Sequence, residues 1–443
     1  MALPVHALLS WVYCTHLNML SLSVILASIS VASATFVNMT SVVPSRKVGK
    51  RCTGEIFSLA DVAAAQECTT INIAGFTVPA GQTFSLSPPD GAVVSMTGQI
   101  TFAVTPWAGP LMVIRGNDIT FNGNSHNLVG NGDQYWDGLG GSGGIQKPAP
   151  MITLDMSGTF ENVVILNSPQ RAVAINTDGL TVSGVTVNNA AGAAANSRSA
   201  GKPAGANTDA SPQEADVATL TFQHSAANNI VIQNSVVTNQ DDCLAINRGT
   251  NIKFTGNSCT GGHGISIMFS VFQGSISSNT VVSGVTISNN IGEQFYRTSS
   301  AHSLTPPNPA SNQQVRTRVF CGFAYLTFNS SGNALRIKTD ATATGSTVSN
   351  IVYSGNKGSA TQFGVLIDQS YPSVLGTPGT GVVISGVSFT GTNTLTVGST
   401  GHRVEVNCGS TSSCTGTWNF AGLAVTGGTG STVKNAPVTG GSF

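Results

Sequence analysis

NNIVIQNSVVTNQDDCLAINRGTNIKFTGNS, from Asn228 to Ser258, contains two similar segments, NNIVIQNS and TNIKFTGNS, whose matching asparagines, Asn229 and Asn251, are 22 residues apart. In each segment apolar and polar residues alternate, which predicts a short β-strand with one buried face. Each strand ends in asparagine or glycine, the residues that most readily adopt left-handed backbone at a turn. The stretch therefore predicts a strand-and-turn unit that repeats about every 22 residues.

The same unit recurs along most of the chain: NDITFNGN from Asn117, ENVVILNS from Glu161, GVTISNN from Gly284, NIVYSGN from Asn350 and GVVISGVSF from Gly381. Asn162 and Gly184 are again 22 residues apart, and Asn117 precedes Asn162 by about twice that step. Stacked turns of equal length are typical of a solenoid, so we expect an all-β chain that forms one parallel β-helix. A β-sandwich is the alternative, although it requires no fixed step. One short helix is expected near Leu59 to Gln66.

Composition limits the classes of function. The chain has 443 residues, of which only 9% are charged, and its formal net charge is zero. This balance excludes a polybasic nucleic-acid surface and an acidic disordered tail, so we expect no nucleic-acid partner. The length alone would suggest several domains, but a repeat fold accommodates it in one.

The N-terminal region has the pattern of a secretory leader. The first charged residue is Arg46, and the apolar run LSLSVILAS leads to the small residues Ala32-Ser33-Ala34. This predicts a signal peptide at residues 1–34, too short to span a bilayer, with Met19 as a second candidate start; a buried strand is the alternative. Residues 35–51 end in Lys50-Arg51, which predicts a pro-segment, although such a pair also occurs as an ordinary solvated feature. We expect a secreted, extracellular protein whose domain spans residues 52–443.

Eight cysteines in an exported chain predict disulfide bonds. Three neighbouring pairs are available: Cys52 with Cys68, Cys243 with Cys259, and Cys408 with Cys414. Spacing alone does not establish this connectivity. Cys14 would leave with the leader, and Cys321 has no neighbouring partner.

Four fragments carry candidate chemistry: Asn207-Thr208-Asp209, Asp241-Asp242, Gly262-His263-Gly264 and Arg336-Ile337-Lys338. Because neighbouring strands in a parallel sheet are about 4.8 Å apart and Asp242 precedes His263 by 21 residues, the acids and the histidine are expected on adjacent turns of one face. Arg336 and Lys338 occupy alternate positions of a strand and so face the same side. The fragments are thus expected to form one site.

These fragments resemble glycoside hydrolase family 28, the polygalacturonases, whose NTD, NQDDC, GHG and RIK motifs occur here in that order. The resemblance covers roughly Cys52 to the C-terminus. It implies a right-handed parallel β-helix, of the fungal endo-acting type, that inverts configuration while hydrolysing the α-1,4 bonds of polygalacturonic acid in pectin. It also implies a monomer that needs no metal ion or cofactor and has no membrane association once the signal is removed.

The resemblance also implies a role for each site residue. Asp241 would be the general acid, and Asp209 and Asp242 would activate the water. His263 would be hydrogen-bonded into the acid cluster and count among the catalytic residues. The residues that would bind substrate are Asn207, Arg336, Lys338 and, in IDQSY, Tyr371.

The residue types support this chemistry without the family name. Inverting hydrolysis needs a protonated carboxyl and a carboxylate separated widely enough to admit water, and clustered acids favour keeping one of them protonated. Two fixed cations suit the carboxylates of galacturonate units. Simpler interpretations stay open: an acid pair in a solvated turn or binding calcium, a purely structural histidine, and cations that only pair with the acids.

The sequence departs from the family pattern in places. Asn176-Thr177-Asp178 is a second NTD, but it lies nearly three turns before Asp241, so we select Asp209. The family continues NTD with GFD, which is missing here. Residues near 210–224, 268–273 and 291–328 exceed the repeat, and we hypothesise errors in gene-model translation, with genuine surface loops as the alternative. The competing functions are a non-catalytic pectin-binding β-helix, a pectate lyase, and an exo-acting or other pectin-backbone hydrolase.

Overall fold

The computed structural model describes residues 47–141, 143–205, 220–222, 227–269, 279–293 and 332–443, all within the unit from Arg46 to Phe443. The predicted signal peptide and residues 35–46 of the predicted pro-segment lie outside the described residues. So do Asn207, Asp209 and most of the three excess segments.

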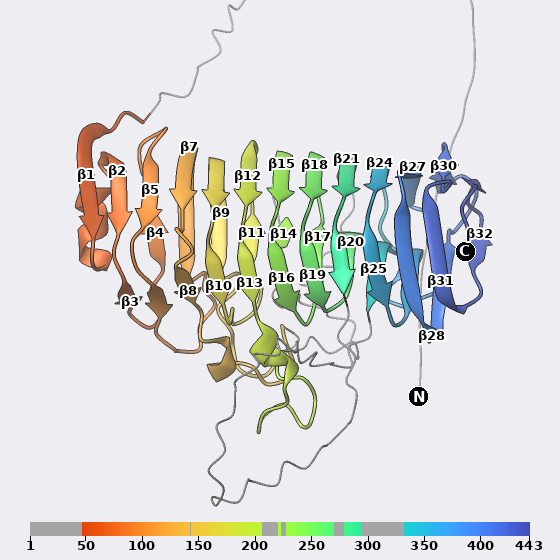
Figure 1. Cartoon of the computed structure of the whole chain (residues 1–443), viewed down its shortest axis with the longest axis horizontal. Coiled ribbons are helices and arrows are strands. Elements are labelled where there is room, and N and C mark those ends of the chain that lie inside the picture. Colours follow the sequence, from red (N-terminus) through yellow and green to blue (C-terminus); the bar gives the residue numbers. More distant parts are fainter. Residues whose placement is uncertain (1–46, 142, 206–219, 223–226, 270–278, 294–331) are drawn as a thin grey trace, which may run out of the picture. The chain divides into compact units, whose positions relative to one another are not determined.

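Parallel strands stack in three sheets along one axis (Figure 1). The first sheet contains β1 (Lys50–Ile56), β2 (Cys68–Ile73), β5 (Val93–Met96), β7 (Met112–Asn122), β9 (Ile152–Glu161), β12 (Leu180–Ser183), β15 (Ala227–Gln233), β18 (Gly249–Thr255), β21 (Val281–Ser288), β24 (Ser346–Ser354), β27 (Val382–Thr390), β29 (Cys414–Thr415), β30 (Trp418–Asn419) and β33 (Val438–Thr439).

The second sheet contains β3 (Phe76–Val78), β6 (Ile100–Phe102), β8 (Asn127–Val129), β10 (Val164–Leu166), β13 (Thr186–Asn188), β16 (Val236–Asn239), β19 (Ser258–Gly261), β22 (Ile291–Glu293), β25 (Lys357–Ala360), β28 (Asn393–Asn407) and β31 (Leu423–Thr429). The third sheet contains β4 (Phe84–Leu86), β11 (Val173–Ile175), β14 (Leu220–Phe222), β17 (Asp242–Ile246), β20 (Gly264–Phe269), β23 (Asn333–Asp340), β26 (Phe363–Tyr371) and β32 (Thr432–Lys434). The long strands β7, β9 and β28 each continue from one sheet into another. The prediction of a parallel β-helix is confirmed.

The 22-residue step is one of several offsets between stacked strands. β15 and β18 pair with an offset of 22 residues, but β12 and β15 differ by 50, β18 and β21 by 33, and β21 and β24 by 66. Asn117 and Asn162 do not belong to one corner, because the register places Asn162 beside the residue after Asn122. The strands therefore stack in register while the segments between them vary in length, as solenoid folds allow.

Stacked apolar residues form the core. Ile230, Ile252, Val285, Ile351 and Val387 occupy the same position on successive strands of the first sheet and are fully buried. Burying each such side chain contributes about 1.5–3 kcal/mol. Alternate residues of these strands point outward, as the sequence pattern predicts.

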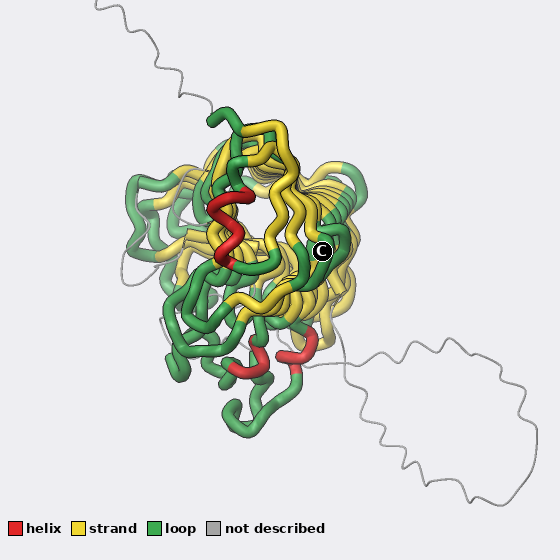
Figure 2. The backbone as a smooth tube through the Cα atoms, turned by 90° about the vertical axis from the view of Figure 1, so that its left-hand side faces the viewer, coloured by secondary structure: helices red, strands yellow, loops and turns green. Residues whose placement is uncertain are grey.

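Helical elements are few among the described residues: η1 (Leu59–Asp61), α1 (Val62–Ala65), η2 (Gly132–Gln134) and η3 (Ala190–Ala193). The expected helix near Leu59 is present, and it lies across the N-terminal end of the stack (Figure 2). There Val62 and Ala65 join the core next to Ile56, so α1 covers an end that would otherwise expose apolar residues. None of the described helices has the length and apolarity that crossing a membrane requires.

The predicted corner asparagines adopt left-handed backbone. Asn234, Gly256, Asn289, Gly355 and Gly391 follow one another at the corner between the first and second sheets, with φ between 51° and 68°. Directly after these corners, buried asparagines form a ladder in which Asn257 donates to Asn290, Asn290 to Asn356, and Asn356 to Asn393. This ladder satisfies side-chain amides that would be costly to bury alone.

Disulfides join Cys52 to Cys68, Cys243 to Cys259 and Cys408 to Cys414. These are the three neighbouring pairs that the sequence offers. The Cys243–Cys259 bond links β17 to β19 on the following turn, directly next to the two acids.

Candidate active site

The candidate site lies where the strands of the third sheet begin. Asp242 opens β17 and pairs with Gly264 on β20, and Ile265 pairs with Leu335 on β23. Asp241 and His263 each come directly before the pair formed by Asp242 and Gly264, so the fold places them side by side on adjacent turns.

His263 is held against Asp241 by both its side chain and its backbone. Nδ1 of His263 is 3.0 Å from Oδ1 of Asp241, and the His263 N–H donates to the Asp241 carbonyl oxygen at 3.1 Å. The two flanking glycines explain the GHG motif. Both have positive φ, and a Cβ on Gly262 or Gly264 would collide with the carbonyl oxygen of Asp241 or Asn333. Only glycine lets the neighbouring turns approach His263 this closely.

Asp242 is fully buried among positively charged groups. Arg336 Nη2 is 3.6 Å and Lys338 Nζ 3.8 Å from its Oδ2, while Ser266 Oγ donates to its Oδ1 at 2.5 Å. Burial disfavours the charged form, but the charges of Arg336, Lys338 and His263 and the bond from Ser266 outweigh it. The pKa of Asp242 therefore lies below its ordinary value, and this carboxylate stays ionised.

The rest of the NQDDC motif fixes the backbone of the two acids. Asn239 Nδ2 donates to the Asp242 carbonyl at 3.0 Å, and Gln240 Nε2 to the Asn189 carbonyl at 2.9 Å on a preceding turn. The Asp242 N–H donates to Asp241 Oδ1 at 2.6 Å. Cys243 then turns into the core. Each residue of the motif thus has its own structural role.

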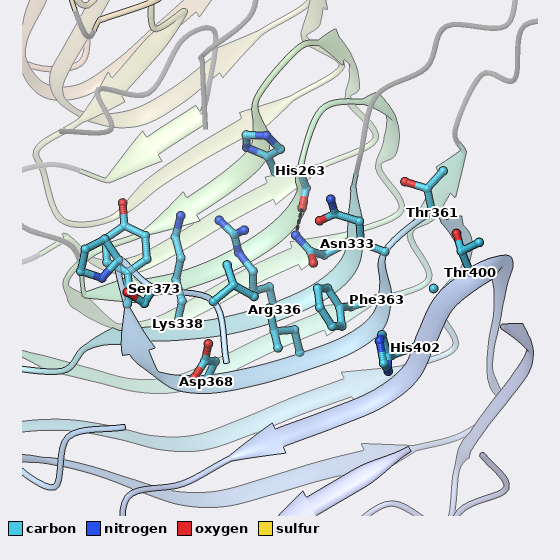
Figure 3. A pocket seen from close by; sticks show the side chains of 16 residues that line it. His263, Asn333, Arg336, Lys338, Thr361, Phe363, Asp368, Ser373, Thr400 and His402 are labelled. Atoms are coloured by element: carbon cyan, nitrogen blue, oxygen red, sulfur yellow. Dashed lines mark hydrogen bonds between the residues drawn. The ribbon is translucent and has the colours of Figure 1, made fainter. Parts of the chain in front are cut away.

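A pocket of about 450 Å³ opens beside these acids (Figure 3). His263, Arg336, Lys338 and Tyr371 line it, and Lys338 Nζ lies 4.8 Å from the centre of the Tyr371 ring. Arg336 and Lys338 point to the same side of β23, as their alternate positions predict (Figure 3). The pocket thus presents two cations next to a carboxylate pair, a surface suited to an anionic ligand.

The structure assembles six of the predicted site residues: Asp241, Asp242, His263, Arg336, Lys338 and Tyr371. Asn207 and Asp209 lie outside the described residues. Asp178 of the second NTD is exposed beyond the C-terminal end of β11 and accepts hydrogen bonds from Asn228. It is a turn residue at the other end of the strand from the site.

Sequence reasoning missed three polar residues here: Ser266, Asn333 and Asp368. Ser266 was open to inference, because it lies two residues after Gly264 and faces the same side of β20. Asn333 and Asp368 carry no comparable signal, because only the register places them beside the pocket.

The acids and the histidine also satisfy the geometry of a cation site, since one donor atom from each of Asp241, Asp242 and His263 lies within 4.8 Å of the others. Arg336 and Lys338 argue against a divalent cation at this position. Their charges already lie within 4 Å of Asp242 and would repel a further cation.

Comparison with known proteins identifies the family. The model of glycosyl hydrolases family 28 matches residues 68–293 and 318–441. The chain belongs to glycosyl hydrolases family 28. The predicted family 28 assignment is therefore confirmed, and together with the relatives described next it makes the chain a glycosidase of the polygalacturonase type. The family match does not include residues 294–317, which fall within the segment 291–328 that exceeds the repeat.

Relatives within family 28 cover most of the chain. A probable endopolygalacturonase of Aspergillus fumigatus is 34% identical over 89% of this chain and 92% of the relative. An endo-polygalacturonase of Sclerotinia sclerotiorum is 37% identical over 82% and 80%. The solved endopolygalacturonase I of Stereum purpureum, which is complexed with two galacturonates, is 38% identical with a TM-score of 0.71, covering 88% of this chain and all of that one.

Proposed function

We propose that this chain is a secreted endo-polygalacturonase that hydrolyses the α-1,4 bonds of polygalacturonic acid. The observation that carries the proposal is the contact of Asp242 with Arg336 and Lys338 beside the Asp241–His263 pair, at the edge of one pocket. A cationic surface next to two carboxylates suits a substrate that is itself a polycarboxylate.

The roles follow from the surroundings of each group. Arg336 and Lys338 hold the substrate carboxylate. Asp242, kept ionised by its neighbours, accepts a proton from the attacking water together with Asp209. Asp241 gives a proton to the leaving oxygen, and His263 orients Asp241 through the 3.0 Å contact. Among the described residues, the cluster around Asp242 contains no acid other than Asp241. The contribution of Asp209 therefore rests on the family resemblance.

The proposed hydrolysis inverts the configuration of the anomeric carbon. Inverting pairs generally lie about 6.5–9.5 Å apart, whereas donor atoms of Asp241 and Asp242 come within 4.8 Å because the residues are adjacent in sequence. The wide separation expected from general chemistry is thus absent between these two acids. We propose inversion on the family resemblance, in which Asp209 and Asp242 activate the water while Asp241 protonates the leaving oxygen. Proton NMR of the first product tests this proposal, since a β-anomer is expected and an initial α-anomer would show retention.

Endo action and secretion have separate support. The relatives named above are endo-acting by their names, and three disulfides favour an oxidising compartment. We therefore propose internal cleavage by an extracellular enzyme. A solution of polygalacturonate should lose viscosity long before most bonds are cut, whereas exo action would release monomer with little early loss of viscosity.

The central test is release of reducing ends from polygalacturonic acid. Asp241→Asn should lower kcat by about 10²–10⁴-fold, the usual contribution of a general acid. Asp178→Asn is the matched control, because it makes the same change in the rejected motif and should keep near-normal activity. Binding of polygalacturonate by the full chain without any release of reducing ends would instead support the non-catalytic binding protein.

A further inference from the structure

Beyond Arg336 and Lys338 the pocket continues along the third sheet. Its lining there consists of Thr361, Gln362, Phe363, Thr400, Gly401 and His402. Asn333, Phe363 and His402 pair in register on successive turns, and Figure 3 shows Phe363 and His402 on the other side of Arg336 from Lys338. The pocket therefore extends over more turns of the coil than the acids and cations occupy.

Phe363 and His402 stack on each other and form one wall of this part of the pocket. Their ring centres are 5.6 Å apart and their planes differ by 19°, so the two rings are stacked. The Phe363 ring is almost buried, while the His402 side chain is 45% exposed. Stacking covers one face of each ring, so the exposed His402 ring, supported from behind by Phe363, is the surface on which the flat, apolar C–H face of a pyranose can pack.

The wall differs from the site at Arg336 in its charge. His402 Nδ1 lies 2.9 Å from Glu405 Oε1, so any proton on the histidine is matched by a neighbouring carboxylate. Arg403 donates to the Gly427 carbonyl and does not line the pocket. Among the described residues, this part of the pocket therefore presents no fixed cation that would demand a carboxylate.

We propose that Phe363 and His402 form a further substrate subsite, which stacks on one galacturonosyl residue and accepts it with its carboxyl group free or methyl-esterified. The site at Arg336 and Lys338 requires the free carboxylate. This inference rests on the proposed function and adds to it a rule for which ester patterns are cut.

The first test is the dependence of KM on oligogalacturonide length. In the wild type, KM should fall once the oligomer is long enough to reach the wall. His402→Ala should remove that fall, raising KM for long oligomers by about 3–10-fold, as expected for loss of one aromatic contact. KM for shorter oligomers should not change. His126→Ala, the same change at a position that does not line the pocket, is the control and should behave as wild type.

The second test is ester tolerance. His402→Lys places a fixed cation on the wall and should shift the ratio of kcat/KM values toward unesterified over partly methyl-esterified oligomers. An unchanged ratio, or an equal rise of KM for short and long oligomers in His402→Ala, would overturn the subsite. If even the wild type releases no reducing ends, the proposed function fails. Calorimetric binding of the same oligomers to wild type and His402→Ala then decides the subsite by itself.

Discussion

Ser266 carries no charge, yet it controls the charge of the residue it touches. Its hydroxyl donates to Asp242 at 2.5 Å and helps to keep the pKa of that carboxyl low. Ser266→Ala removes this bond, so the pKa of Asp242 should rise. The acid limb of the kcat/KM profile, which reports the free enzyme's essential base, should therefore move to higher pH.

The measurement is kcat/KM against pH for wild type, Ser266→Ala and Ser266→Thr, whose hydroxyl should restore the profile. The pH dependence of the free energy of unfolding gives a second measurement, and the direction of its change follows from the lowered pKa. Because the pKa of Asp242 is lowered in the folded state, its contribution to the free energy of unfolding is complete above the ordinary value of 3.8 and is lost as pH falls through the folded value. The alanine variant should lose stability at higher pH than wild type. Identical acid limbs in both assays would refute the role of Ser266.

At the scale of the strand and its corner, the asparagine ladder should carry much of the local stability. Asn290 accepts from the backbone and side chain of Asn257 and donates to Asn356 and to the Phe254 carbonyl. Asn290→Ala leaves buried donors and acceptors on both sides without partners. It should lower the free energy of unfolding by about 2–3 kcal/mol.

Denaturant unfolding measures this cost, with the preceding residue as the control. Asn289 has left-handed backbone with φ of 54°, which glycine also adopts freely, so Asn289→Gly should cost only about 0.5 kcal/mol. Equal losses in the two variants would show that the ladder adds nothing beyond the turn itself.

For the whole molecule, a contact could be predicted from the sequence only where few residues separate its two partners along the chain. Asp241 and His263 are separated by one short turn of the coil, so sequence spacing alone could place them together. Phe363 and His402 occupy the same register position as Asn333 on the next two turns. The segments between these turns vary in length, so no fixed spacing in the sequence predicts that these residues are neighbours. Sequence patterns capture the regular strands, whereas the register across irregular loops depends on tertiary packing.

The segment between β22 and β23 provides the test at this scale. The family match passes from residue 293 to residue 318, while β22 pairs with β19 and β25, and β23 with β20 and β26. Since these pairings involve no residue of 294–317, deleting that segment should leave the coil folded. Shortening the connection between β22 and β23 should change the free energy of unfolding by about 1 kcal/mol or less.

Circular dichroism during denaturation and release of reducing ends should both match the full chain. A deletion that removes residues 357–360 instead takes out β25, which joins β22 to β28, and should prevent folding. Loss of the fold in the first deletion would show that 294–317 is integral to the coil. Activity gained by it would favour our hypothesis that the excess is not part of the functional protein, and tryptic peptides from 291–328 in secreted material would contradict that hypothesis directly.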